Sequence, residues 1–469
     1  MEVRKNIPVK TIAEVTGGEL LCGDPEAVVR NLTVSSLEIK GDDLFIPIRG
    51  ERTDGHKYIQ NALHDGAAAS LSQYKEIRSE KPVILVEDSV KALQQIGRWY
   101  REKYVKMPVI GITGSVGKTT TREMIAKALS PEKKIYSTKK NLNSQVGLPI
   151  TVFESDLGAD ISVLELGMSE FGEMEAISSV CCPDDAAITN IGVCHIMNLK
   201  TQDNILREKL KILTGMPSGC RLLLNGDDPL LCDLTEEKIH EMGIAAGKTV
   251  RIFFFGTGEN CRFRASENVL SGNRRTFTFT DTLTGFTQHV ELSVIADFMV
   301  TNALCALSFA VLYGVDLKKS AEALRDFSGL SGRGQILEKN GYRIVDDCYN
   351  AAPASVKGAL KTLSDMEIKG KRVVCLADML ETGDREQEYH REVGTYLAGL
   401  PNAPDELFLY GDLSRLIGEQ ALAAGYPGKV KCFGTDGFKE MKKQIEDTLE
   451  EGDVLLIKGS NGMKLERLL

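Results

Sequence analysis

Short apolar runs alternate with helical patterning along most of the chain. From residue 108 to residue 228, four buried-type runs each end in a turn or polar group and are followed by apolar positions at helical spacing: PVIGIT, ADISVLELG, DDAAITNIG and CRLLLNGDD. Strands that alternate with helices are typical of βαβ units on a parallel sheet. The alternation returns later in YRIVDDCYN, KRVVCLADML, ELFLYG and DVLLIKGS. The pattern therefore predicts an α/β fold.

Changes in this pattern divide the chain into three blocks. Residues 1–107 hold the strand-like DLFIPIRG and PVILVED and the helix-like HKYIQNALHDGAAA and VKALQQIGRWYREKY. Residues 108–329 add a β-rich insertion (VRIFFFG, RRTFTFTD, QHVELSVI) and the apolar helix TNALCALSFAVLYG. The segment SGLSGRGQ predicts a hinge to the third block, residues 330–469. Three blocks agree with 469 residues at roughly 100–200 residues per domain.

Composition narrows the class of protein and its partners. The net charge of −9 disfavours a nucleic-acid backbone or an anionic membrane as main partner. No stretch approaches the roughly 20 apolar residues of a membrane span, and the start of the chain lacks a signal-type apolar core. The 11 cysteines form no C-x-x-C pair, as expected of reduced thiols. We therefore expect a cytoplasmic protein with no nucleic-acid partner.

The first apolar run of the central block leads into a glycine-rich turn and a helix start. The sequence T-G-x-x-G-K-T is a shortened phosphate loop and not a plain Walker A motif, because Ile112 occupies the place of its first glycine. Backbone N–H groups and the helix dipole would face an anion there. Lys118 should reach the β- and γ-phosphates, and Thr119 should coordinate Mg²⁺. The residues expected to hold a nucleoside triphosphate are Thr113, Gly114, Ser115, Val116, Gly117, Lys118, Thr119 and Thr120.

Other candidate residues keep a plain structural interpretation beside the functional one. Glu165 and His195 follow buried runs, and at adjacent strand ends they could hold a second metal, yet each could serve its own turn. Asn141 and Asn143 stand in a loop where amides commonly stabilise turns. Lys209 lies in NILREKLKIL, whose pattern alone favours a solvated helix lysine.

The ordered motifs together resemble the Mur ligase superfamily. They are LFIPIRGERTDGHKYI, TGSVGKTT, TKKNLNSQVGLP, LELGM, TNIGVCH, GLSGRGQ, DDCYNAAPASVKGAL, DMLETGDREQEYH and VLLIKGSNGM, and they span essentially the whole chain. The forms DDCYNAAP and DML-E-x-G resemble the member that adds D-alanyl-D-alanine. The resemblance implies a small N-terminal α/β substrate domain for a uridine nucleotide sugar, a central ATPase domain with a P-loop-type parallel sheet, and a C-terminal Rossmann-like domain.

The resemblance also implies an activity. The expected enzyme is a monomeric ATP-dependent ligase that joins D-alanyl-D-alanine to the peptide carboxylate of a UDP-N-acetylmuramoyl-tripeptide through an acyl phosphate, in peptidoglycan precursor synthesis. A kinase would instead transfer the γ-phosphate to a hydroxyl. Two alternatives remain open from the residues: a related ligase with another amine, of the Mur or polyglutamate type, and a nucleotide-driven switch that makes no product.

Individual residues acquire implied roles. Thr119 and Glu165 would bind one Mg²⁺, while His195 and Lys209 would serve a second, with Lys209 carbamylated. An ammonium repels a divalent cation, whereas a carbamate presents anionic oxygens. The remaining implied assignments are catalytic contributions from Lys118, His195, Lys209 and Arg333; adenine at Asn302, γ-phosphate at Arg333 and ribose at Asp347; and substrate contacts from Asp54, Gly55, His56, Asn141 and Asn143.

Three positions depart from the family pattern. The chain reads Ser35-Ser36-Leu37 where the family usually has Asp-Ser/Thr-Arg in the nucleotide-sugar region. Ala352 replaces the second asparagine of Y-N-A-N-P, and Lys211 stands where a glutamate commonly follows the modified lysine. None of these departures falls on the phosphate loop or on the expected metal ligands.

Overall fold

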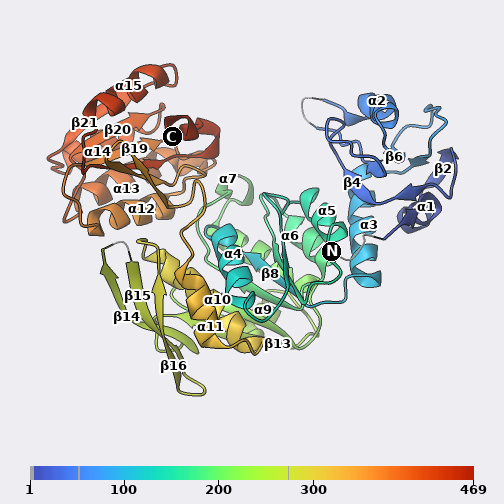
Figure 1. Ribbon diagram of the computed structural model, residues 1–469, viewed down its shortest axis with the longest axis horizontal. Coiled ribbons are helices and arrows are strands. Elements are labelled where there is room, and N and C mark those ends of the chain that lie inside the picture. The colour runs from blue at the N-terminus through green and yellow to red at the C-terminus, as the bar shows by residue number, and fades with distance from the viewer. Residues whose placement is uncertain (1–4, 51–52, 273) are drawn as a thin grey trace.

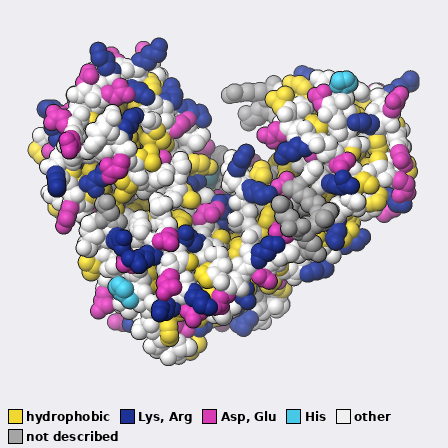
Figure 2. All heavy atoms as spheres, in the orientation of Figure 1, with side chains coloured by type: hydrophobic (Ala, Val, Ile, Leu, Met, Phe, Trp, Pro, Cys, Tyr) yellow, Lys and Arg dark blue, Asp and Glu magenta, His cyan; other side chains and the backbone are white. Residues whose placement is uncertain are grey.

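The computed structural model describes residues 5–50, 53–272 and 274–469 (Figure 1). The first four residues, and Glu51 and Arg52 of the early motif, lie outside the described residues. Three α/β domains follow one another, with the N-terminal and C-terminal domains on opposite sides of the central one. The surface is hollowed between these two outer lobes (Figure 2). The predicted three-domain α/β fold is confirmed.

The N-terminal domain has a five-stranded sheet of order β2-β7-β6-β5-β4, in which β4 to β7 run parallel, and a small β1-β3 pair. Its elements are β1 Ile7–Pro8, α1 Val9–Thr16, β2 Glu19–Cys22, β3 Val28–Val29, β4 Asn31–Thr33, β5 Asp43–Phe45, η1 Gly55–Tyr58, α2 Ile59–His64, β6 Ala69–Ser72, β7 Val83–Leu85 and α3 Ser89–Lys103. The helix expected in HKYIQNALHDGAAA is too long: it ends at His64, Gly66 takes a left-handed φ of 118°, and the last alanine begins β6.

The central domain is built on a nine-stranded sheet of order β16-β15-β14-β13-β12-β11-β8-β10-β9. Its strands are β8 Val109–Thr113, β9 Ile135–Ser137, β10 Ile161–Glu165, β11 Asp185–Ile188, β12 Cys220–Asn225, β13 Val250–Gly256, β14 Phe263–Ser271, β15 Arg274–Asp281 and β16 Phe286–Leu292. Its helices are α4 Lys118–Leu129, α5 Gly147–Phe153, α6 Glu173–Cys181, α7 Ile196–Leu199, α8 Gln202–Leu210, η2 Lys211–Thr214, α9 Glu236–Glu241, α10 Phe298–Leu312 and α11 Leu317–Arg325.

Two cores cover the faces of this sheet. Apolar residues of α4, α10 and α11 pack on one face, and those of α5, α6 and α8 pack on the other. The expected β-rich insertion is partly wrong, because β13 pairs in parallel with β12 and so continues the main sheet. The antiparallel part is β14-β15-β16, and β14 was not expected. Buried strands of parallel sheets are apolar throughout, which explains why β8, β10, β11 and β12 were predictable.

The C-terminal domain has a six-stranded sheet of order β17-β18-β22-β19-β20-β21, parallel except for β17. Helices cover both faces of the sheet, as in other doubly wound folds. The elements are β17 Gln335–Lys339, β18 Tyr342–Asp346, α12 Pro353–Asp365, β19 Arg372–Ala377, η3 Gly383–Arg385, α13 Glu386–Ala398, β20 Glu406–Tyr410, α14 Arg415–Ala423, β21 Lys429–Phe433, α15 Phe438–Thr448, β22 Val454–Lys458, η4 Asn461–Met463 and η5 Leu465–Leu468.

Among the described residues, no helix is both long and apolar enough to cross a membrane. The most apolar one, α10, is accounted for within the protein, because nearly all of its residues are buried in the central core.

Helix α3 packs against α5 and α6 of the central domain, with Tyr100 against Phe153, and one guanidinium adds a polar attachment. Arg101 donates from Nε to the Cys181 carbonyl at 2.8 Å and from Nη2 to the Cys182 carbonyl at 3.2 Å. It also bonds the Val105 carbonyl and pairs with Asp184 at 3.0 Å. Arg101 thus links the end of α6 to the chain that follows α3, and it adds to the apolar packing at this junction.

Replacing Arg101 by methionine should lower the free energy of unfolding by at least about 2 kcal/mol, because several carbonyls lose a charged donor at once. Arg98→Met is the matched control: Arg98 lies one turn earlier and makes an exposed pair with Glu102, so its loss should cost less than about 0.5 kcal/mol. Urea denaturation of both variants measures the difference. Equal stabilities would contradict the junction role.

Candidate active site

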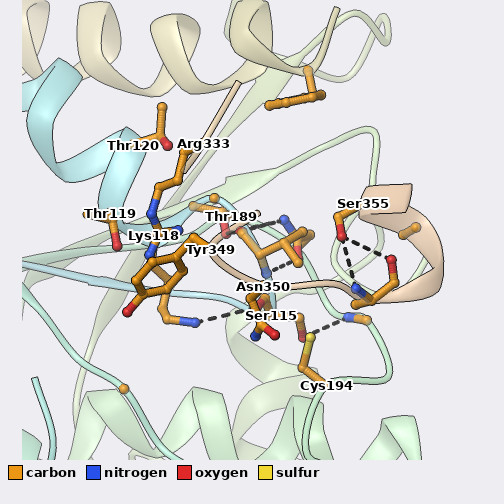
Figure 3. Close-up of a pocket in the computed structure, with 18 of the residues that line it drawn as sticks. Ser115, Lys118, Thr119, Thr120, Thr189, Cys194, Arg333, Tyr349, Asn350 and Ser355 are labelled. Atoms are coloured by element: carbon orange, nitrogen blue, oxygen red, sulfur yellow. Dashed lines mark hydrogen bonds between the residues drawn. The ribbon is translucent and has the colours of Figure 1, made fainter. Parts of the chain in front are cut away.

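A cavity of about 610 Å³ lies between the central and C-terminal domains. The central domain contributes the phosphate loop, the turns after β10 and β11, and the start of α10; the C-terminal domain contributes the hinge, the segment after β18 and the end of β22. Figure 3 shows side chains from both domains pointing into this space. The cavity therefore gathers the carboxyl ends of strands from two parallel sheets, where α/β proteins bind ligands.

The phosphate loop is held in shape by the turn that follows β11. Ser115 N donates to the Asn190 carbonyl and Val116 N to the Asn190 side chain, both at 3.0 Å, and Thr189 Oγ1 donates to the Val116 carbonyl at 2.7 Å. Gly114 has φ 151°, and a Cβ there would lie 1.9 Å from Thr189 Oγ1. Sequence reasoning missed Thr189 and Asn190, although TNIG was among the motifs.

Two lysine ammonium groups converge on one carbonyl of this loop. Lys118 Nζ donates to the Gly114 carbonyl at 2.8 Å, and Lys209 Nζ donates to the same oxygen at 3.0 Å. The expectation of a solvated Lys209 is wrong, because only 2% of this residue is exposed. Burial, reinforced by the charge of Lys118, lowers the pKa of Lys209 well below its ordinary value of 10.5. Lys209 is thereby biased toward its neutral, nucleophilic amine.

Glu165 ends β10 as a carboxylate held from two sides. It is 3% exposed; its Oε1 accepts from Asn143 Nδ2 at 2.7 Å and its Oε2 from Arg122 Nη1 at 3.3 Å. Asn143 thus reaches the cavity, whereas Asn141 is exposed and does not line it. Arg122, a buried guanidinium of α4, was missed because helical spacing does not reveal a partner 43 positions away.

His195 reaches the same cavity from the other side of β8. The expectation that Glu165 and His195 follow adjacent strands is wrong, because β8 lies between β10 and β11. His195 takes a left-handed φ of 60°, and its Nδ1 lies 3.0 Å from Oε2 of Glu381 in the C-terminal domain. Burial lowers the pKa of His195, and Glu381 acts in the opposite direction.

The C-terminal wall depends on two consecutive aspartates. Asp346 is buried and accepts from Gly332 N at 2.6 Å, which fixes the hinge. Asp347 lines the cavity and pairs with the buried Lys458 at 2.6 Å; burial raises the pKa of Asp347 while Lys458 opposes that shift. Arg333 Cζ lies 3.9 Å from the centre of the Tyr349 ring, and both side chains line the cavity (Figure 3). Sequence reasoning missed Tyr349 and Lys458.

The other residues expected at the nucleotide fall into two groups. Ser115, Val116, Gly117, Thr119, Thr120 and Asn302 line the cavity. Asn302 accepts from Thr121 Oγ1 at 3.1 Å and lies against Gly117. Thr113 does not line the cavity; its hydroxyl is buried without a hydrogen-bond partner among the described residues.

The residues expected at the nucleotide sugar lie in the N-terminal domain, away from this cavity. The Asp54 carboxylate accepts from Tyr74 OH at 2.7 Å and lies 2.6 Å from His56 Nδ1. The other ring nitrogen of His56 accepts from Gln73 N at 3.1 Å. The backbone N–H of His56 also donates to Asp54, and this bond, followed by those from Tyr74 OH and the His56 ring, holds the pKa of Asp54 well below its usual range. Both side chains therefore already stabilise their own loop, and their substrate contacts remain a prediction.

Lys211 and Leu37, two of the departures from the family pattern, lie in very different surroundings. Lys211 pairs at 2.8 Å with the buried Glu208, whose other oxygen accepts from Gly172 N at the start of α6. Lys211 thus neutralises a carboxylate beside the site. Leu37 is 95% exposed, so the side chain in place of the usual arginine points into solvent.

The donor set suits Mg²⁺ only in part. No group of three His, Cys, Asp or Glu side chains among the described residues is placed to hold a metal ion. Mg²⁺ commonly binds through one or two protein oxygens with substrate phosphates completing the shell. Thr119 and Glu165 fit that description, whereas an imidazole with a lysine ammonium does not.

The fold and the cavity define a class of protein. It is a three-domain α/β protein whose ligand site lies between two domains and contains a phosphate loop. Three family models match the three domains in turn. The Mur ligase family catalytic domain matches residues 28–101, the Mur ligase middle domain matches 112–310, and the Mur ligase glutamate ligase domain matches 332–461. The chain belongs to the Mur ligase family.

Relatives match over nearly the full length. The UDP-N-acetylmuramoyl-tripeptide–D-alanyl-D-alanine ligase of Bacillus subtilis is 33% identical over 98% of this chain and 97% of its own. MurF from Acinetobacter baumannii has a crystal structure with TM-score 0.87 at 28% identity, covering 99% of this chain and 98% of that one. The structure of MurF ligase from Thermotoga maritima in complex with ADP has a TM-score of 0.80 at 25% identity, covering 94% of this chain and 96% of that one.

The burial of Lys209 makes a prediction about stability. The pKa of Lys209 is lower in the folded protein than in the unfolded chain. Between these two pKa values the unfolded chain binds more protons, so the free energy of unfolding of the wild type rises with pH across that interval. Lys209→Met should unfold at higher urea concentration than wild type at neutral pH, and the difference should shrink as the pH approaches 10.5. Urea titrations in buffer purged of CO₂ measure this. A wild type more stable than Lys209→Met at neutral pH would contradict the lowered pKa of Lys209.

Proposed function

We propose that this protein is an ATP-dependent ligase that joins D-alanyl-D-alanine to the peptide carboxylate of a UDP-N-acetylmuramoyl-tripeptide in peptidoglycan precursor synthesis. The observation that carries the proposal is the cavity between the phosphate loop and the hinge, in a chain similar along its whole length to ligases of that name. A switch protein needs a site for nucleotide alone. Here the cavity extends to side chains of a second domain, as a second reactant requires.

The chemistry divides into two displacements. A carboxylate oxygen of the tripeptide attacks the γ-phosphorus, the bond to the β–γ bridging oxygen breaks, and ADP leaves. The dipeptide amine then attacks the acyl carbon and loses a proton, and phosphate departs with one former carboxylate oxygen. Lys118 and Arg333 neutralise the charge that gathers when two anions meet. Closure of the two domains would exclude water, which otherwise hydrolyses the acyl phosphate.

The proposed roles of single residues follow from where they lie. Thr119 and Glu165 would hold Mg²⁺ beside the β- and γ-phosphates, Asn302 would face the adenine and Asp347 the ribose. Mg²⁺ supplies charge neutralisation when bound. Asn143 acts through the Glu165 carboxylate that it already contacts. The remaining substrate residues (Asp54, Gly55, His56, Asn141) would belong to the nucleotide-sugar and peptide path.

A second Mg²⁺ would require a modified Lys209. The neutral amine favoured by burial can attack CO₂, forming an N–C bond and releasing a proton, and the resulting carbamate would supply anionic oxygens to the cation that His195 also serves. An unmodified ammonium would repel the cation. The proposal thus gives the burial of Lys209 a chemical purpose.

The domain limits proposed are residues 1–107 for the nucleotide-sugar domain, 108–329 for the ATP domain and 330–469 for the C-terminal domain. Action as a monomer in the cytoplasm, where ATP and nucleotide sugars occur, completes the proposal.

A ligation assay tests the function. Tripeptide acceptors that differ in their third residue are each combined with D-alanyl-D-alanine, D-alanine or D-glutamate and ATP, and products are identified by mass. The proposal expects an amide product only with the dipeptide, and ADP in equal amount. Steady phosphate release without acceptor or amine would indicate a switch, and a product with a single amino acid would indicate a related ligase.

Removing the Lys118 ammonium should lower turnover by roughly 10² to 10³, the scale for one preorganised charge-stabilising group. Lys127→Ala, on the same helix but away from the cavity, is the control and should turn over as wild type does. Steady-state rates measure both. A near wild-type rate for Lys118→Ala would remove the phosphate-loop role.

Lys209→Ala should be severely impaired, because the proposed carbamate oxygens are lost. Acetate at high concentration could enter the vacated space and supply two carboxylate oxygens, so it should partly restore turnover, whereas equal chloride should not. Turnover against acetate concentration is the measurement. An active Lys209→Ala enzyme that ignores acetate would rule out the carbamate.

A further inference from the structure

The segment DMLETGDREQEYH forms a hydrogen-bonded loop of the C-terminal domain, and the tip of this loop contacts the central domain. The buried Asp378 carboxylate accepts three backbone N–H groups, from Asp412 and Leu413 at 3.1 Å and from Ser414 at 2.7 Å. This anchors the start of the loop at the carboxyl end of β19. The proposed reaction uses none of these groups.

A buried histidine fixes the next turn of the same loop. His390 Nε2 accepts from Met379 N at 3.0 Å, and its Nδ1 lies 2.6 Å from the Glu386 carbonyl. Thr382 Oγ1 donates to the Met379 carbonyl at 3.1 Å, and Leu380 N donates to Ser460 Oγ at 2.8 Å. The backbone on both sides of Glu381 is therefore fastened to its own domain.

The loop tip meets the central domain at α7. Gly383 has φ 70°, and a Cβ there would lie 3.3 Å from Ile196 Cγ2 and 3.6 Å from Met197 N, so the loop tip packs against the start of α7. Glu381 takes a left-handed φ of 62°, and its Oε2 lies 3.0 Å from Nδ1 of His195. Two uncommon backbone conformations, at His195 and at Glu381, thus meet across the domain boundary.

We propose that Glu381 is a positioning residue for His195: its carboxylate keeps the proton on Nδ1 and turns Nε2 toward the cavity. The inference rests on the proposed function, in which His195 would serve the second Mg²⁺ together with a modified Lys209. Carboxylates commonly orient metal-binding imidazoles through the ring nitrogen that does not bind the metal. Because Glu381 belongs to the other domain, His195 is oriented only while the C-terminal domain is docked against α7.

An ordinary exposed ion pair is the competing explanation. The Glu381 side chain is 64% exposed, and pairs of that kind contribute little to stability. Stability therefore cannot separate the two explanations, since both expect Glu381→Ala to fold normally. The tautomer of His195 separates them: a carboxylate held at Nδ1 keeps the proton there on the neutral ring, whereas an exposed pair that is mostly open in solution leaves the tautomer unchanged when Glu381 is removed.

Long-range ¹⁵N–¹H NMR of histidine-labelled protein without ligands reads that tautomer at pH 8. His195→Gln assigns the signals by removing them. We expect the Nδ1–H tautomer in wild type and a shift toward Nε2–H in Glu381→Ala. Glu388→Ala is the control: it lies in the same segment, pairs with Arg385, and should keep the wild-type pattern. An identical His195 tautomer in wild type and Glu381→Ala would overturn the proposal.

Kinetics supply the second readout. Glu381→Ala should lower kcat by about 10- to 100-fold, the usual scale for a partner of a metal-binding histidine, and leave the KM for D-alanyl-D-alanine unchanged. In a His195→Ala background the same substitution should have no further effect. Full additivity of the two losses would overturn the proposal. A wild type that makes no ligation product would refute the proposed function instead, and the tautomer result would stand by itself.

Discussion

The carbonyl oxygen of Gly114 accepts from two lysine ammonium groups at once, at 2.8 and 3.0 Å, and much of the site depends on that arrangement. Two like charges on one oxygen repel each other, and burial of Lys209 makes the repulsion stronger. The arrangement is relieved by a bound anion or by loss of a proton from Lys209. A protein with a net charge of −9 thus concentrates positive charge where triphosphate and carboxylate would have to meet.

The domains divide the remaining work. The central sheet places the phosphate loop, Glu165 and His195 at one edge, with β8 between the strands that carry the last two. The C-terminal domain adds Arg333, Asp347 and Glu381, and the buried Asp346 fixes the hinge through Gly332. The N-terminal domain packs through α3 on α5 and α6 of the central domain, with Arg101 bonded to the end of α6. The cavity lies where the two larger domains meet.

Local patterns were sufficient for some features and not for others. The phosphate loop was predictable because a buried strand, glycines and a helix start are consecutive in the chain. Lys209 was not, because its partner lies 95 positions away and the helical pattern shows only the apolar neighbours. Arg122 and Glu381 were missed for the same reason. The order of β10, β8 and β11 is likewise invisible to periodicity, since it depends on which strands pair. Only the family resemblance indicated a special role for Lys209.

Oxygen transfer tests the central claim most directly, namely that this cavity brings the γ-phosphate of ATP to a peptide carboxylate. The acceptor tripeptide is prepared with ¹⁸O in the reacting carboxylate and turned over with D-alanyl-D-alanine and ATP in ordinary water. Mass spectrometry of the released phosphate should show one ¹⁸O atom for every amide bond formed. Phosphate without ¹⁸O would show that water or another group had received the γ-phosphate, and would contradict the account.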